Sequence, residues 1–437
     1  MVSVEANRMR EAFIERVDEE KLLDCMRCGF CLPSCPTYIQ TGNNEVHSPR
    51  GRIAIMKAVR DGFVDWDSSL EESINLCLGC RACEPACPAG VEYGHLLEQS
   101  RDAIQSVKNP SLKEKVSRKL AFDHLFKDQS KMVGATKLVR AYQASGLQKV
   151  ARKIGFMNLF PPMMKEMEKA LPKIPKSVKR EIPVIPPKSV VKVAFFTGCL
   201  MDTVFRQTND RTIQLLQLLG CEIVIPEEQV CCGALHGHSG ELEKAKVNAR
   251  RNINAFEQIE ADYIVNNAGG CGAFLYEYGH LLADDVEYSE RAKTFDSKII
   301  DISSLILELG IVQKLAEIQK DHVELVTYQD SCHLRNVNRV VSEPRELLKA
   351  IPHVDYVELP TAGLCCGSAG IYNLLNQKMA LKILDSKMDD VKGTNASVII
   401  TTNPGCLLQM RAGIHRAGLS EKVRSEHIVD YLIEVLS

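Results

Sequence analysis

The chain has 437 residues, a formal net charge of −2 and a sequence pI near 6.6. This length allows two to four domains with sizeable cores, and nothing in the composition indicates disorder or a fibre. A net charge so close to zero gives no sign of the basic surface that binds nucleic acid, so we expect no nucleic-acid partner.

Seventeen cysteines are an odd total, which argues against a complete set of disulfides. The first residues lack the apolar core of a signal peptide, and no apolar run reaches the length of a membrane span, so we expect a cytoplasmic protein. Residues up to about Leu23 predict an amphipathic helix with Met9, Phe13, Ile14 and Val17 near one face. This face either packs on the protein, docks a partner, or makes a peripheral contact with the inner face of the membrane.

Two copies of the pattern C-x2-C-x2-C-x3-C-P lie between residues 25 and 87. Thiolates two residues apart wrap three corners of a 4Fe-4S cubane, and the proline after the fourth cysteine turns the chain so that this cysteine reaches the other cluster. Structural zinc sites or disulfides are the alternatives, but zinc sites usually pair two C-x2-C knuckles. We therefore expect two 4Fe-4S clusters, one held by Cys25, Cys28, Cys31 and Cys87 and the other by Cys77, Cys80, Cys83 and Cys35.

The segment between the two runs contains HSPRGRIAIMKAVRDG, in which Ser48 and Pro49 predict the start of a helix and Gly62 its end. Arg50 and Arg52 lie at the start of this helix, close in sequence to the first cluster. They either neutralise cluster charge or form surface ion pairs.

Residues 91 to 188 show a charged helical pattern that is interrupted at Pro161 and Pro162 and ends in a stretch rich in proline and lysine. Such a stretch forms a semi-rigid linker, so we expect a domain boundary near Ser189. The predicted parts are a two-cluster ferredoxin-type domain at 1–110, a helical segment and linker at 111–189, and two cysteine-rich domains at 190–320 and 321–437.

The two cysteine-rich domains are copies of one pattern. Each opens with a strand that ends in a lone cysteine, continues through a helix, a second strand, a Cys-Cys-Gly loop and a helix, and closes with a third strand and a cysteine. Matching cysteines are 133, 134 or 135 residues apart, so the duplication is nearly free of insertions. Alternating strands and helices predict a parallel sheet in each copy, with ligands at the carboxyl ends of the strands.

Four cysteines recur at the same positions in both copies. They are Cys199, Cys231, Cys232 and Cys271 in the first and Cys332, Cys365, Cys366 and Cys406 in the second. Adjacent cysteines followed by glycine suit two ligands of a small metal centre, because glycine allows a close approach of the backbone. Four soft thiolates bind zinc, or iron and sulfide, so we expect an additional iron-sulfur or zinc centre here. Buried cysteines that act only as small apolar side chains are the alternative.

Several residues lie outside this repeated set. We expect Cys221 to belong to the core. Loop histidines and asparagines flank the thiolates. The histidines are either ligands or proton donors, or they are solvated, and we favour solvated side chains. We interpret the asparagines as turn formers. These histidines and asparagines are His236, His238, His333, Asn267 and Asn403.

Taken together, the tandem cysteine runs and the two Cys-Cys-Gly domains resemble the iron-sulfur subunit of glycolate oxidase over nearly the whole chain. The specific motifs are the eight-cysteine module, HSPRGRI, TGC at Thr197, both Cys-Cys-Gly motifs and NPGC at Asn403. Iron-sulfur subunits of anaerobic glycerol-3-phosphate dehydrogenase and of lactate-oxidising complexes share this layout. The resemblance implies a multidomain fold, in which an α-helical ferredoxin-type two-cluster domain precedes a duplicated α/β cysteine-rich pair.

The Cys-Cys-Gly domain is also shared with heterodisulfide reductase, whose domains end in C-x2-C. Here Phe274 and Gln409 replace the last cysteine of the two copies. Each domain therefore has one ligand fewer, which argues against a noncubane cluster and against disulfide reduction. Four thiolates still suffice for a simpler centre.

We find no G-x-G-x-x-G motif after a strand and no P-loop, so we expect no nicotinamide, flavin or nucleotide triphosphate site in this chain. Two clusters without an organic cofactor suit one-electron transport. The resemblance implies that a separate FAD flavoprotein oxidises glycolate to glyoxylate and passes electrons through this chain to a quinone or another acceptor. The chain is then a subunit of a glycolate dehydrogenase complex, with no substrate site and no catalytic acid or base of its own.

Three alternatives remain open. The same relay could serve a flavoprotein that oxidises lactate or glycerol-3-phosphate. The Cys-Cys-Gly domains could form a thiol-disulfide enzyme like heterodisulfide reductase. The chain could also be an iron or redox sensor without a catalytic partner.

Overall fold

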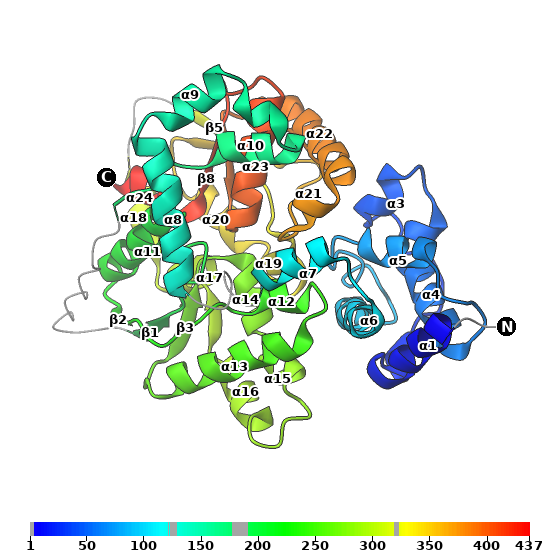
Figure 1. Ribbon diagram of the computed structural model, residues 1–437. Helices are drawn as coiled ribbons and strands as arrows, with labels where there is room; N and C mark the ends of the chain where they lie inside the picture. The colour runs from blue at the N-terminus through cyan, green and yellow to red at the C-terminus, as the bar shows by residue number, and fades with distance from the viewer. Residues whose placement is uncertain (1–3, 121, 123–128, 177–190, 319–322) are drawn as a thin grey trace.

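The computed structural model describes residues 4–120, 122, 129–176, 191–318 and 323–437. Figure 1 shows a helical N-terminal module beside a larger body that contains two parallel sheets. The predicted multidomain class, with a helical two-cluster part and a duplicated α/β part, is confirmed.

The N-terminal module packs its helices around a core that includes Phe13, Met56 and Leu96, all fully buried. Helices α1 and α6 lie against each other, and α4 contacts both. The elements are α1 (Val4–Arg16), α2 (Glu19–Leu23), α3 (Pro36–Gln40), η1 (Glu45–His47), α4 (Pro49–Asp61), α5 (Ser68–Asn75) and α6 (Tyr93–Val107).

The single helix predicted up to Leu23 is two helices. Asp18 separates them, because its carboxylate accepts a hydrogen bond from the Lys21 amide and caps α2. Met9 and Val17 of the apolar face are buried against α4 and α6, and only Ile14 is exposed. This face is therefore a packing surface and is not available for a membrane contact.

The helix predicted from HSPRGRI is confirmed as α4. The Ser48 hydroxyl accepts a hydrogen bond from the Gly51 amide, and Pro49 occupies the first helical position. Gly62 ends the helix with a left-handed φ of 77°.

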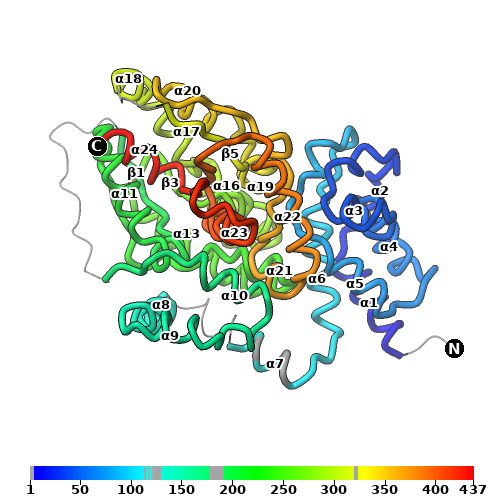
Figure 2. Tube along the Cα trace, turned by 90° about the horizontal axis from the view of Figure 1, so that it is seen from above, coloured from blue at the N-terminus to red at the C-terminus, as the bar shows by residue number. Residues whose placement is uncertain are grey.

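The middle segment is helical, as predicted, and α10 begins at Pro162 and lies against α23 of the second repeat. Figure 2 shows α8 and α9 at the edge of the body, away from the N-terminal module. The predicted boundary near Ser189 lies outside the described residues. The elements are α7 (Leu112–Arg118), α8 (Gln129–Ala144), α9 (Leu147–Lys153), η3 (Phe156–Leu159) and α10 (Pro162–Ala170).

Within the described ranges, no helix has the length and apolarity needed to cross a bilayer.

The first repeat forms a parallel sheet in the order β2-β1-β3-β4. Its strands are β1 (Lys192–Phe195), β2 (Glu222–Val224), β3 (Tyr263–Asn266) and β4 (Ile299–Asp301). Its helices are α11 (Arg206–Leu218), α12 (Ala234–Gly237), α13 (Leu242–Glu257), α14 (Gly269–Leu275), α15 (Tyr278–Leu281), α16 (Ser289–Asp296), α17 (Ile302–Glu308) and α18 (Ile311–Ala316).

The second repeat has the same topology, with the strand order β6-β5-β7-β8. Its strands are β5 (Glu324–Tyr328), β6 (Val354–Tyr356), β7 (Val398–Thr401) and β8 (Arg424–His427). Its helices are α19 (Cys332–Asn336), α20 (Glu343–Lys349), α21 (Tyr372–Leu375), α22 (Gln377–Thr394), α23 (Pro404–Arg416) and α24 (Ile428–Leu436). The three predicted strands of each repeat are present, but β4 and β8 were not predicted. Both are short, and β8 reads RSEH, which has no apolar run.

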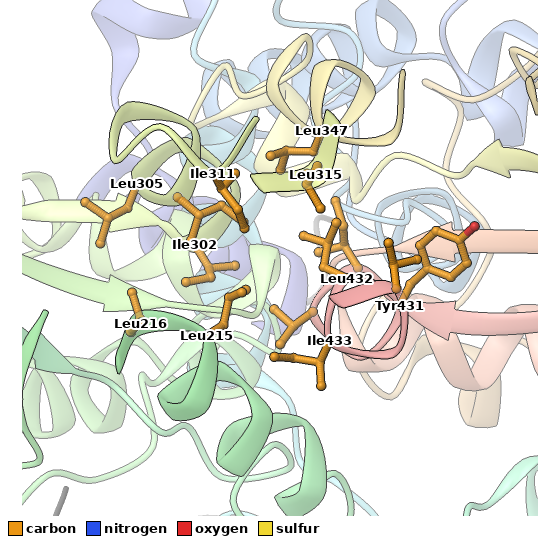
Figure 3. Packing of buried hydrophobic residues seen from close by; sticks show 14 of the residues in the cluster. Leu215, Leu216, Ile302, Leu305, Ile311, Leu315, Leu347, Tyr431, Leu432 and Ile433 are labelled. Atoms are coloured by element: carbon orange, nitrogen blue, oxygen red, sulfur yellow. The ribbon is translucent and has the colours of Figure 1, made fainter. Parts of the chain in front are cut away.

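One apolar core joins the two repeats (Figure 3). Helix α11 of the first repeat packs on α24 of the second, and α17 of the first packs on α20 of the second. Helices α11 and α20 follow the first strand of their repeat, whereas α17 and α24 follow the fourth. The two contacts are therefore equivalent under exchange of the repeats, as at a twofold interface. Leu215, Ile302, Leu347 and Leu432 in this core are fully buried.

The same symmetry brings the carboxyl ends of β3 and β7 together. The Gly269 amide donates to the Thr402 carbonyl at 3.0 Å, and the Gly270 amide donates to the side-chain oxygen of Asn403 at 3.0 Å. The loops that carry the repeated cysteines follow the strands at this edge, so the two cysteine sets face each other.

The N-terminal module contacts both repeats. Arg81 and His95 bind the Glu277 carboxylate of the first repeat, at 2.6 and 3.1 Å. The Asn336 amide of the second repeat donates to the Cys80 carbonyl at 2.8 Å. These contacts hold the second cysteine run against the cysteine-rich domains.

We expect Leu432→Ala on α24 to lower the free energy of unfolding by about 2–5 kcal/mol, because it leaves a cavity in the joint core. Leu218→Ala on α11 is the matched control, since Leu218 is 48% exposed. This control should change the free energy by less than about 0.5 kcal/mol. Urea denaturation followed by circular dichroism measures both, and equal effects would contradict a tightly packed joint core.

The contact with Glu277 also predicts a pH dependence. Burial lowers the pKa of His95, but the Glu277 carboxylate outweighs burial, and the net pKa lies above its usual value of 6.5. Its contribution to stability is therefore present below about pH 6.5 and lost as the pH rises through the raised folded pKa. We expect His95→Gln to lower the denaturation midpoint at about pH 6 and to matter little at about pH 9. In a Glu277→Gln background, this difference between the two pH values should disappear.

Candidate functional site

The two ferredoxin-type loops adopt the same backbone conformation. Arg27 and Gly29 in the first loop have φ values of 56° and 91°, and Gly79 and Arg81 at the equivalent positions have 64° and 58°. Left-handed residues in such loops curl the chain so that amide groups converge on its concave side, where they bind anions. The Gly79 amide donates to the Cys77 sulfur at 3.4 Å. Both loops therefore have the shape that an anionic iron-sulfur cluster requires.

Four of the predicted cluster ligands line one small cavity. They are Cys35 from the first run and Cys77, Cys80 and Cys83 from the second. The structure thus brings Cys35 to the three cysteines of the other run. Their assignment as ligands of one cluster stays a prediction.

The remaining four lie nearer the surface. Cys31 lies close to Cys25 and Cys35, whose charges, after burial, raise its pKa. Cys25 and Cys87 border the core of the N-terminal module, and Cys28 is exposed. This set is the more accessible of the two.

Arg52 tests whether the second set fits a cluster. It is fully buried, and it donates to the Ser73 carbonyl at 2.7 Å and to the Thr37 hydroxyl at 3.0 Å. Its Nη1 atom has no hydrogen-bond partner among the described residues. Burial lowers its pKa, but the charges of Cys77 and other neighbours outweigh burial and raise it. A buried cation needs a buried anion, and an iron-sulfur cluster with its thiolates supplies one.

Arg50 behaves differently, since it forms an ion pair with Glu45 at 2.6 Å on the surface. Arg50 also donates to the Arg27 carbonyl of the first cysteine loop at 3.0 Å, so it combines the surface pair with a contact to that loop. Arg52 lies beside thiols of the second cluster set instead of the first.

The surroundings of Cys77 favour its thiolate form. Burial raises its pKa, but the charges of Arg52 and Arg101, with hydrogen bonds from Tyr93 and Gly79, outweigh burial and lower it. The thiolate is the form that binds metal. The surroundings of Cys77 therefore suit a cluster ligand.

The cysteines of both repeats meet in one cavity of about 470 Å³ between the N-terminal module and the two cysteine-rich domains. In the second repeat the Cys366 and Cys406 sulfurs are 3.4 Å apart. The thiols that line the cavity are Cys199, Cys231, Cys232, Cys271, Cys332, Cys365, Cys366, Cys406 and Cys77.

Crowding shifts the acidity of these thiols. Interaction with Cys231 and burial raise the pKa of Cys199, and interaction with Cys365 and burial raise that of Cys332. Several buried thiols cannot ionise side by side unless a cation compensates their charge. An iron or zinc centre supplies that charge, so these donor sets fit the predicted metal centres.

Cys80 links the two cysteine systems. Cys80 packs with Cys332 and Cys365 of the second repeat in one buried cluster. Interaction with Cys365, together with burial, raises the pKa of Cys80. A residue of the ferredoxin-type run therefore lies against the cysteine set of the second repeat. Nothing in the sequence indicates this contact.

The interpretation of the loop histidines as solvated is wrong for His236, whereas His238 and His333 are half-buried and line the cavity. His236 is 2% exposed, and its Nε2 lies 3.2 Å from the Phe122 carbonyl oxygen. His238 and His333 stack with ring centroids 5.0 Å apart, and His238 binds Glu98 at 2.6 Å. Burial, followed by the charge of His238, lowers the pKa of His333 to about 3, so this imidazole is neutral.

The asparagines are more than turn formers, which corrects that interpretation too. Asn267 is buried and donates to the side chains of Asn209 and Thr212. Asn403 bridges the repeats, and its amide nitrogen lies 3.6 Å from the Cys406 sulfur. The expectation that Cys221 belongs to the core is confirmed, since it is 1% exposed in the joint core.

The two residues that replace the last cysteine are buried behind the thiols. Phe274 packs edge-on against His238 and Tyr278. Gln409 accepts a hydrogen bond from Asn373 at 3.0 Å. Neither supplies a soft ligand, so each repeat keeps its four thiols.

The sequence did not predict two basic side chains that lie beside the thiols, Arg101 and Lys387. Arg101 donates to the Cys77 and His238 carbonyls, and nothing in the sequence indicates contacts over such separations. Lys387 is 3% exposed and donates to the Thr361 hydroxyl at 2.9 Å, close to Cys366. A sequence signal did exist, because Lys387 interrupts the apolar stripe of α22, whose buried residues include Ile383, Leu384, Met388 and Val391.

We expect Arg52→Met to lower the free energy of unfolding by about 3–5 kcal/mol and to reduce the iron content, because it leaves buried anions without their cation. Arg50→Met is the matched control and should cost at most about 1 kcal/mol. Iron analysis of anaerobically purified protein and chemical denaturation measure these effects. Full iron content and stability in the Arg52 variant would contradict the role of this charge.

Three family models match the chain. They are a 4Fe-4S dicluster domain at residues 21–91, the linker region of the glycolate oxidase iron-sulfur subunit at 113–171, and a cysteine-rich domain at 193–276 and 326–411. The dicluster and cysteine-rich matches agree with iron-sulfur cofactors, including the two predicted 4Fe-4S clusters.

Several named proteins are similar over long stretches. The "Probable glycolate oxidase iron-sulfur subunit" of Bacillus subtilis is 55% identical and covers 98% of this chain and 97% of that protein. The "Glycolate oxidase iron-sulfur subunit" of Escherichia coli is 32% identical over 87% of this chain and 88% of its own length. A "Lactate utilization protein A" of Exiguobacterium is 31% identical over 55% of this chain and 97% of its own length. By these full-length matches, the chain belongs to the family of glycolate oxidase iron-sulfur subunits.

Proposed function

We propose that this chain is the electron-relay subunit of a flavin-dependent glycolate oxidase complex. Its 4Fe-4S clusters would supply the one-electron steps between the flavin of a partner subunit and a quinone or another acceptor. The names of the two long relatives support glycolate as the partner's substrate. The reduced thiols support a cytoplasmic location.

The packing of Cys80 with Cys332 and Cys365 in one buried cluster is the observation that carries this proposal. The thiols form a series from the exposed Cys28 to the cavity between the repeats, and Cys35 and Cys80 connect its parts. A chain that only stored or sensed iron would not need its two cysteine systems in contact.

The entry of electrons fits the exposed first set. Met26 and Phe30 flank Cys28 and are 68% and 66% exposed. Exposed apolar side chains beside a redox site suit the docking of a partner protein. We assign this surface to the flavoprotein.

The exit fits the cavity between the repeats. Leu200, Leu235 and Ile371 line it together with the thiols and form an apolar wall. An apolar pocket with a few polar groups is the usual form of a small-molecule site. A quinone ring beside the thiols of the second repeat satisfies this description.

Lactate is the second candidate for the partner's substrate. The proteins named lactate utilization protein A support it, although they cover 55% of this chain. Disulfide reduction is disfavoured, because Phe274 and Gln409 occupy the positions where the disulfide-reducing relatives carry a fifth cysteine.

The test is to co-express the chain with its flavoprotein and to purify both together under anaerobic conditions. Added glycolate should then reduce the clusters, as seen by electron paramagnetic resonance, and lactate should not. If only lactate reduces the clusters of the complex, lactate replaces glycolate as the proposed substrate of the partner. A chain that binds no flavoprotein would end the relay proposal.

Cysteine variants test the two thiol systems separately. We expect Cys83→Ser to remove up to about four of about eight cubane irons and to block reduction by glycolate. Cys365→Ser should leave the cubanes reducible and stop transfer to the acceptor. Cys221→Ala is the control for a buried thiol outside both sets and should change neither readout. Normal turnover in the Cys365 variant would exclude the Cys-Cys-Gly domains from the relay.

A further inference from the structure

The segment 129–165 has an unusual charge. It contains seven lysine or arginine residues and no aspartate or glutamate, in a chain whose net charge is −2. Lys149 and Lys153 are exposed and form no ion pair with the residues that the structure describes. Their charge is therefore available to a partner.

The same segment exposes large apolar side chains. Leu138 on α8, Ile154 after α9 and Leu159 in η3 are 74%, 71% and 80% exposed. They are not needed for packing, because Met132 is the buried residue of α8 and Ala151 that of α9. A cluster of exposed apolar residues on helices marks a contact surface.

The two kinds of residue alternate on α9 and just after it. Leu147 and Val150 are exposed on the same short helix as Lys149 and Lys153, and η3 contacts α9 directly. We call residues 138–160 the α8–η3 surface. It has the composition of a helix that lies in a membrane interface, with apolar residues for the acyl boundary and lysines for the headgroups.

We propose that the α8–η3 surface docks the protein on an anionic lipid bilayer. Leucine, isoleucine and phenylalanine side chains enter the interface, and the unpaired lysines contact lipid phosphates. The segment 129–165 has no acidic side chain, and Glu168 of α10, which reaches α9, is paired with Arg152 and is 11% exposed. The exposed charge is therefore positive, which favours an anionic lipid surface over an ordinary protein interface, where both signs of charge occur.

The position of this surface agrees with the rest of the molecule. Figure 2 shows α8 and α9 on the opposite side of the body from the N-terminal module. A membrane there leaves the surface around Cys28 free for a protein partner. The apolar face of α1 cannot compete for lipid, because it is buried.

Vesicle co-sedimentation with the full-length, cluster-loaded chain tests the proposal. We expect binding to vesicles that contain phosphatidylglycerol and no binding to pure phosphatidylcholine, with a strong decrease in high salt. Lys149→Gln with Lys153→Gln should weaken binding about fivefold per lysine, or roughly 25-fold together. Ile154→Gln and Leu159→Gln should each weaken it roughly tenfold.

The controls carry equal changes elsewhere. Lys314→Gln with Lys422→Gln removes two exposed lysines, and Val286→Gln replaces an apolar residue that is 101% exposed. Both should bind vesicles like the unchanged protein. Circular dichroism and iron content check that all variants are folded and loaded.

Three results would overturn the proposal: no binding to phosphatidylglycerol vesicles, equal losses in the control variants, or α8–η3 variants that bind vesicles normally but lose the flavoprotein. The last result would assign the surface to the protein partner. The proposal stands apart from the relay function, because reduction of the clusters by glycolate without vesicles should be unchanged in every α8–η3 variant.

Discussion

The need to neutralise buried sulfur charge governs the centre of this molecule. Many thiols lie close together in surroundings of low polarity, where neighbouring anions repel strongly and water cannot screen them. The protein answers with buried basic side chains, including Arg52, whose pKa is raised by the neighbouring thiols, and Lys387, whose pKa is lowered to about 8 by burial. Neither can balance all the thiols around it, and the remaining compensation falls to metal. The fold and the cofactors are therefore coupled, and the apo protein should be the less stable form.

The duplication supplies the geometry for this concentration of sulfur. In a parallel sheet the loops that bind ligands lie at the carboxyl ends of the strands. The joint core packs α11 on α24 and α17 on α20, which turns these ends of both sheets toward each other. Asn403 closes the junction from the second repeat. Residues distant from the thiols thus determine that eight of them share one cavity.

The sequence predicted which cysteines gather, because metal-binding motifs have strict spacing, and their assignment as ligands stays a prediction. It predicted β1 and β5 because buried parallel strands are continuous apolar runs. It failed for β8, whose residues RSEH are held by pairing with β7 instead of by their own preference. It also failed for His236, since polar loop residues look solvated until another module covers them. The contact between Cys80 and Cys365 depends on how separately folded parts dock, and local patterns carry no information about docking.

The two repeats share a topology, yet they make different contacts with the N-terminal module. One N-terminal module serves both, and its Cys80 packs with Cys332 and Cys365 of the second repeat, while Arg81 anchors it to the first through Glu277. A dimer of identical subunits would have presented two equal faces and two equal modules. Fusion of the halves into one chain removes that equality. The second repeat can then specialise in the contact with the cysteines of the N-terminal module, and the first in anchoring that module. A single polypeptide thus assigns different tasks to two halves of the same topology.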